Sequence, residues 1–64
     1  MTYYNIGNIY KILAEVENKN ENCERATSAY EEALKVYTQE QFPSECKKIK
    51  ENIKIVHKML SMID

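Results

Sequence analysis

Apolar residues recur at helical spacing near the start of the chain. They form two stripes, one made of Tyr3, Ile6, Tyr10 and Leu13 and the other of Ile9, Ile12 and Val16. Intervals of three and four residues bring side chains onto one face of an α-helix, and two neighbouring stripes make a wide apolar face. We therefore expect a helix over about residues 2–17, with Thr2 as its N-cap. The asparagine-rich run at residues 18–22 ends this helix, because asparagine favours turns and caps.

A second helix is expected over about residues 21–40, with Asn20 or Asn22 as its cap. The inward-facing positions carry small or aromatic side chains: Cys23, Ala26, Ala29, Tyr30, Ala33, Leu34 and Tyr37. Alanine leaves room for another helix to approach closely, whereas the tyrosines supply bulk. We therefore expect a close helix–helix contact along this face.

A third helix is expected over about residues 43–62. It begins at Pro43, because proline stops the preceding helix and is tolerated in the first turn of the next one. Its main apolar stripe contains Cys46, Ile49, Ile53, Val56, Leu60 and Ile63, and its second stripe contains Ile55, Met59 and Met62. Short connections make neighbouring helices antiparallel. The pattern, which lacks strand-like alternation, predicts one all-α domain over residues 1–64.

The first two segments carry small residues at the positions where their helices would cross. Gly7 and Ala26 remove bulk there, and Tyr30 would fill the space beside them. Ala33 would leave room for the helix that follows. The order of these residues resembles the tetratricopeptide repeat. The matching positions are Ile6, Gly7, Tyr10, Ala26, Tyr30, Ala33 and Pro43. The resemblance implies an antiparallel helical hairpin followed by a third, capping helix, as a fragment of a right-handed superhelix.

The run NIGNIYKIL at residues 5–13 returns as NIKIVHKML at residues 52–60, an offset of 47 residues. The usual repeat is about 34 residues long, so the chain looks like a long-helix variety in which each helix gains about one turn. In the second copy Lys54 stands where Gly7 stood. A close second crossing is then not required, which suits a terminal capping helix.

The resemblance also implies a non-catalytic protein–protein interaction module. Members of this family hold peptides or partner proteins in a concave groove lined by the first helix of each repeat. By helical position, the groove-facing residues here are Tyr4, Asn8, Lys11, Ile12, Lys48, Glu51, Asn52, Ile55, Lys58 and Met59. Asn8 and Asn52 match two asparagines with which some members bind a C-terminal carboxylate, but Tyr4 replaces a lysine of that clamp. We favour ordinary surface amides over a carboxylate clamp.

The stripe of Ile55, Met59 and Met62 has two interpretations. It packs against the second stripe of the first helix, or it stays exposed as an interface. We expect a homodimer that stacks third helix on third helix, since fewer than three repeats rarely stand alone. The alternatives are a purely structural self-assembly unit, a fragment of a longer repeat array, and a three-helix adaptor bundle that binds a partner helix between its second and third helices.

The candidate reactive residues do not combine into a catalytic or metal site. Cys23 and Cys46 would lie at opposite ends of antiparallel helices, too far apart for a disulfide. Neither forms a closely spaced ligand pair of the kind that zinc sites use, and His57 is the one histidine. The cysteines lack a nearby base, and there is no glycine-rich phosphate loop. We expect neither an enzyme nor a bound cofactor or metal.

Charge and hydropathy narrow the choice of partners. The net charge is −1, and no run approaches the roughly 18 apolar residues of a membrane span. We therefore expect a cytoplasmic protein that binds neither membranes nor nucleic acid. A lysine stripe on the third helix, opposed by glutamates on the second, contains Lys47, Lys50, Lys54 and Lys58. These are expected to be solvated faces that attract each other within the chain, with a surface for an acidic partner as the alternative; aromatic residues for nucleic-acid binding are not interleaved.

Overall fold

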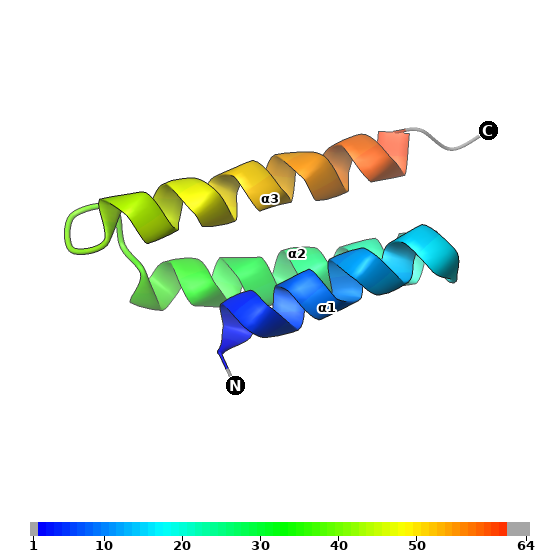
Figure 1. Ribbon diagram of the computed structural model, residues 1–64, viewed down its shortest axis with the longest axis horizontal. Coiled ribbons are helices and arrows are strands. Elements are labelled where there is room, and N and C mark those ends of the chain that lie inside the picture. The colour runs from blue at the N-terminus through cyan, green and yellow to red at the C-terminus, as the bar shows by residue number, and fades with distance from the viewer. Residues whose placement is uncertain (1, 62–64) are drawn as a thin grey trace.

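Residues 2–61, the part of the chain that this computed structural model describes, form three α-helices and no strand. α1 spans Tyr3–Val16, α2 spans Lys19–Val36 and α3 spans Pro43–Ser61. Figure 1 shows α2 returning alongside α1 in the opposite direction and α3 running back along α2. The all-helical class and the three helices expected from the sequence are therefore confirmed.

α1 has the N-cap that the sequence predicts. The Thr2 hydroxyl oxygen accepts a hydrogen bond from the backbone N–H of Asn5 at 3.2 Å. The helix ends at Val16, and the next backbone N–H, that of Glu17, still reaches the carbonyl of Leu13. Asn18 then adopts a left-handed conformation with φ of 45°, which asparagine tolerates better than most residues. This short connection reverses the chain into α2.

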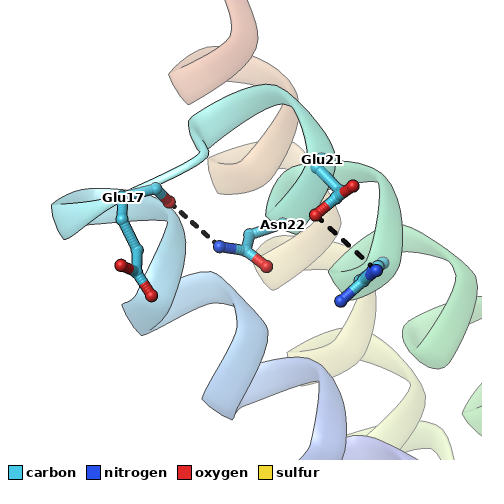
Figure 2. A network of polar contacts seen from close by, with 4 residues as sticks. Glu17, Glu21 and Asn22 are labelled. Atoms are coloured by element: carbon cyan, nitrogen blue, oxygen red, sulfur yellow. Dashed lines mark hydrogen bonds and ion pairs between the residues drawn. The ribbon is translucent and has the colours of Figure 1, made fainter.

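Neither asparagine expected to cap α2 does so. α2 begins at Lys19, before Asn20 and Asn22, and the side chain of Asn18 at the cap position makes no capping bond. The buried Asn22 instead donates from Nδ2 to the backbone oxygen of Glu17 at 2.9 Å (Figure 2). This bond satisfies a carbonyl at the C-terminal end of α1. Asn22 therefore ties the end of one helix to the start of the next.

α2 ends at Val36 and not near residue 40, because a tight turn begins there. Tyr37 leaves the helical region with φ of −92° and ψ of 77°. The backbone N–H of Phe42 donates to the carbonyl of Thr38 at 2.7 Å. The rings of Tyr37 and Phe42 meet edge to face with 5.2 Å between their centres. This turn leads directly into α3, which begins at Pro43 as expected.

α2 is the central helix of the molecule. It packs against both of the others, whereas α1 and α3 barely touch each other. The buried apolar side chains of residues 2–61 are Ala14, Cys23, Ala26, Ala29, Tyr30, Ala33, Cys46, Ile49 and Val56. Because α1 and α3 each have one main neighbour, each keeps one long side free of the core.

The closest contact between α1 and α2 is formed by Gly7 and Tyr30. A Cβ atom placed on Gly7 would lie 2.6 Å from Cε1 and 2.7 Å from Cδ1 of the Tyr30 ring, where carbon atoms prefer about 3.5–4.0 Å. The Tyr30 ring is fully buried, and so are the neighbouring Ala26 and Ala33. The absence of a side chain at position 7 therefore allows this ring to lie against the backbone of α1.

Candidate functional site

The adjoining edges of α1 and α3 carry most of the groove residues selected from the sequence. We call this surface the α1–α3 face, and it consists of Tyr4, Asn8, Lys11, Ile12, Lys48, Asn52, Ile55 and Met59. Lys11 on α1 donates from Nζ to Oδ1 of Asn52 on α3. The Asn52 amide nitrogen donates to the Tyr4 hydroxyl at 3.4 Å and to the Lys48 backbone oxygen at 3.0 Å. These bonds link two helices that otherwise make little contact.

A second set of contacts connects this face to the core. The Tyr30 hydroxyl on α2 donates to Oδ1 of Asn8 on α1, and the Tyr30 ring lies 6.1 Å from that of Tyr4, centre to centre. Burial, and secondarily the neighbouring Tyr4, raises the pKa of Tyr30 to about 12, so its hydroxyl keeps the proton it donates. Asn8 and Asn52 are therefore not the ordinary surface amides that we expected. Their side-chain oxygens accept hydrogen bonds from Tyr30 and Lys11.

Two exposed isoleucines lie beside this polar centre, each about one turn toward the C-terminal end of its helix. Ile12 lies one helical turn beyond Asn8 and is 59% exposed, and Ile55 lies about one turn beyond Asn52 and is 48% exposed. Met59 is half-buried and packs against the core. The α1–α3 face thus combines a hydrogen-bonded centre with large apolar side chains that remain in solvent.

A small pocket opens at one end of this face. It has a volume of about 130 Å³ and is lined by Tyr4, Tyr37, Glu45, Lys48 and Ile49. Its wall combines two aromatic side chains with one carboxylate and one ammonium group. The pocket has room for about one side chain.

Of the two interpretations of the Ile55, Met59 and Met62 stripe, packing against the second stripe of α1 is wrong for the described residues. Ile9 is 46% exposed and Val16 is 76% exposed, and Ile12 and Ile55 are likewise open to solvent. The reason is that both helices pack on α2 and barely meet. Met62, the third member of the α3 stripe, lies outside the described residues. The outer face of α1 is therefore a candidate interface that was not expected from the sequence, although its two apolar stripes were the signal for it.

The remaining groove and reactive residues have separate positions. Glu51 and Lys58 are exposed, and Lys58 is in register with the outward-facing lysines of α3. Cys23 and Cys46 are buried free thiols. Burial raises the pKa of the Cys23 thiol, opposed by a smaller effect of Lys19. A raised pKa leaves little of the reactive thiolate.

Within residues 2–61, no three His, Cys, Asp or Glu side chains gather closely enough to hold a metal ion. No helix in the same range has the length and apolar character needed to cross a membrane.

The ion pairs in the described range lie along α2. Arg25 meets Glu21 at 3.6 Å (Figure 2), and Lys35 meets Glu32 at 2.8 Å. The hydrogen bond with Glu32 raises the pKa of Lys35. Both pairs are exposed and join neighbouring turns of one helix, so solvent screening leaves them little effect on the stability of the fold. Neither pair joins the lysine stripe of α3 to the glutamates of α2.

Comparison with known proteins adds no relative: no family model, no curated protein and no solved structure matches this chain.

Proposed function

We propose that this chain is a non-catalytic protein–protein interaction module that binds a peptide or partner protein on the α1–α3 face. The observation that supports this proposal best is the exposure of Ile12 and Ile55 beside a fixed polar centre. Large apolar side chains left in solvent beside a few oriented polar groups are typical of binding surfaces.

The two parts of the face have different roles in this proposal. Ile12 and Ile55 lose water contact on binding, which contributes about 25 cal/mol for each Å² of apolar surface covered. Lys11, Asn8 and Asn52 orient the partner through their remaining hydrogen-bonding capacity. Because these side chains are already held by bonds within the chain, binding orders few of them, and the entropic cost is small.

The tetratricopeptide-like arrangement remains part of the proposal. It is supported by the contact of Gly7 with Tyr30, by the burial of Ala26 and Ala33, and by the order in which the helices pack. In such an arrangement α1 and α3 are equivalent first helices that line one concave surface, and α3 caps the unit.

The test compares surface variants of equal chemistry. Ile12→Gln and Ile55→Gln each remove an apolar side chain from the α1–α3 face. Val36→Gln is the matched control, because Val36 is on α2 and is 59% exposed, like Ile12. Each variant is immobilised and used to capture proteins from extracts of the native cells, and the bound proteins are quantified. We expect partners that bind the wild type and Val36→Gln but are lost from both isoleucine variants.

Circular dichroism of each variant checks that helicity is unchanged. Equal capture by all four proteins contradicts the proposal, and so does a loss confined to Val36→Gln.

A second candidate function is self-association, supported by the exposed stripe of Ile9, Ile12 and Val16 together with Ile55. A second copy of the chain that covers these side chains forms a homodimer. Under this candidate function the chain binds only copies of itself. Light scattering over a wide concentration range tests this candidate. We expect the apparent mass to double with rising concentration and Ile55→Glu to prevent it. A fully folded monomer at every concentration contradicts it.

A further inference from the structure

The side of α3 that faces away from α2 is strongly basic. It carries Lys47, Lys50, Lys54 and Lys58, which are all exposed. Intervals of three and four residues keep these lysines on one face, while the opposite side buries Ile49, Val56 and other apolar residues. α3 has five lysines and two glutamates, a net charge of +3 with its histidine neutral, in a chain whose net charge is −1.

These lysines form no ion pair within the described chain. The two ion pairs within residues 2–61 involve Arg25 and Lys35 on α2, and none involves the lysines of α3. Four positive charges along about 16 Å of helix repel one another. An anionic partner along this face relieves that repulsion.

The N-terminal half of this basic face is also hollowed. A groove of about 360 Å³, which we call the Pro43 groove, is lined by Gln39, Pro43, Cys46, Lys47, Lys50, Glu51 and Lys54. Pro43 contributes apolar surface, and three lysines against the single carboxylate of Glu51 leave the groove with a net positive charge. A chain segment can therefore lie in the groove while its side chains reach the ammonium groups.

We propose that the outward face of α3 binds an acidic peptide segment, whose backbone lies in the Pro43 groove and whose carboxylates contact Lys47, Lys50 and Lys54. This surface is separate from the α1–α3 face, so it does not depend on the function proposed for that face. The two surfaces lie on different sides of α3, and one partner can contact both.

The chemistry of α3 favours a peptide over other anionic partners. The helix has no arginine and no Phe, Tyr or Trp, so it offers neither the bidentate forks that phosphates prefer nor rings on which bases stack. Its apolar side is packed against α2, with Ile49 and Val56 buried. α3 cannot turn that side into a bilayer as an interfacial helix does. Carboxylates, which a lysine binds as a point charge, fit this face.

The experiment uses a probe matched to the length of the lysine stripe. About five extended residues span the roughly 16 Å from Lys47 to Lys58. Fluorescence anisotropy follows the binding of a fluorescein-labelled pentaglutamate peptide to the full chain, with pentaglutamine as the uncharged control peptide. We expect binding of pentaglutamate alone, with an affinity that falls as salt is added.

Matched variants then locate the site. Lys47→Gln combined with Lys54→Gln removes two charges from the basic face. This double variant weakens pentaglutamate binding about 2- to 30-fold, from the usual strength of exposed ion pairs. Lys19→Gln combined with Lys35→Gln removes the same charge from α2 and changes the affinity less than about 2-fold, because screening limits its reach.

Four outcomes overturn the proposal. The first is absence of pentaglutamate binding, and the second is an equal loss of affinity in both double variants, which indicates a response to net charge alone. The third and fourth are tighter binding of a single-stranded oligonucleotide or of phosphatidylserine vesicles than of the peptide. Circular dichroism of each double variant confirms that the helices are intact before affinities are compared.

Discussion

Replacing Gly7 with alanine tests the closest helix contact in the molecule. The new Cβ would lie 2.6 Å from Cε1, 2.7 Å from Cδ1 and 3.0 Å from Cζ of the Tyr30 ring. An ordinary carbon–carbon contact is about 3.5 Å or longer, so the ring or the helix must move by nearly 1 Å. The ring has no free space to enter, since it is fully buried and its hydroxyl donates to Asn8.

Two opposing effects determine how much Gly7→Ala changes the free energy of unfolding. Alanine gains about 1 kcal/mol over glycine in helix propensity. Overpacking a filled core costs about 1–3 kcal/mol, and a displaced Tyr30 loses a hydrogen bond that contributes about 1 kcal/mol. We therefore expect Gly7→Ala to lower the free energy of unfolding by about 1–3 kcal/mol. A chain of this size has about 3–5 kcal/mol in total, and Tm falls by about 4–24 °C.

Thermal and urea unfolding followed by far-ultraviolet circular dichroism measure this loss. Ser28→Ala is the control, because Ser28 is exposed on α2 and an alanine there gains helix propensity without meeting a neighbour. Tyr30→Leu provides the second background, since it removes the ring that the new methyl group would strike. In that background Gly7→Ala should become stabilising, because only the gain in propensity remains.

The sign of the change in unfolding free energy tests the contact between Tyr30 and α1. A Gly7→Ala protein as stable as the wild type, or more stable, would refute the close approach of the Tyr30 ring to α1. An equal loss of stability in the Tyr30→Leu background would assign the cost to the backbone at position 7 and not to the ring.

Three further predictions follow from the same contacts. Asn22→Ala leaves a carbonyl at the end of α1 without its partner and should cost about 1–3 kcal/mol of unfolding free energy, whereas the exposed Asn20→Ala should change it by less than about 0.5 kcal/mol; urea titrations compare the two. The pKa of Tyr30 rises from 10.0 to about 12 on folding, so the contribution of this side chain to stability is complete below pH 10 and is lost as pH rises from 10 to about 12. The free energy of unfolding, measured by urea titration, should therefore fall more steeply over this range in the wild type than in Tyr30→Phe. Cys23 and Cys46 are buried and should react with iodoacetamide only as the chain opens, so urea should accelerate their alkylation; fast reaction of both thiols in the folded protein would contradict their burial.

The local features of the fold were predictable from the sequence. The intervals between apolar residues located all three helices, Thr2 marked the start of α1, and Pro43 marked the start of α3. Each of these signals acts within a few residues, so a linear sequence contains the information. The bounds of α2 were less predictable, because its end depends on the contact of Tyr37 with Phe42.

The pairing of faces could not be predicted in the same way. Two apolar stripes on α1 and two on α3 left open whether these helices touch, and in the structure Ile9, Val16 and Ile55 are exposed. Which stripe is covered depends on how far each helix is rotated about its axis, and here α2 takes the central position between them. The exposed stripes that result are the surfaces on which the functional proposals depend.

In the candidate site, too, the positions of the residues could be predicted but their contacts could not. Tyr4, Asn8, Lys11 and Asn52 were selected because they occupy groove positions in a resembling repeat, and the structure brings them together on one face. The hydrogen bonds that these side chains make could not be predicted from the sequence. Asn52 accepts a hydrogen bond from Lys11, and Asn8 accepts one from Tyr30. Both bonds join residues that are far apart in the chain.

Site-specific photocrosslinking tests the central proposal, partner binding on the α1–α3 face, most directly. A photoreactive amino acid is placed at position 12 on α1 or at position 36 on α2, two equally exposed sites. Each protein is expressed in the native cells, irradiated and analysed for covalent adducts. We expect a discrete adduct with another protein from position 12 and none from position 36. The same adduct from both positions, or none from position 12, would contradict it.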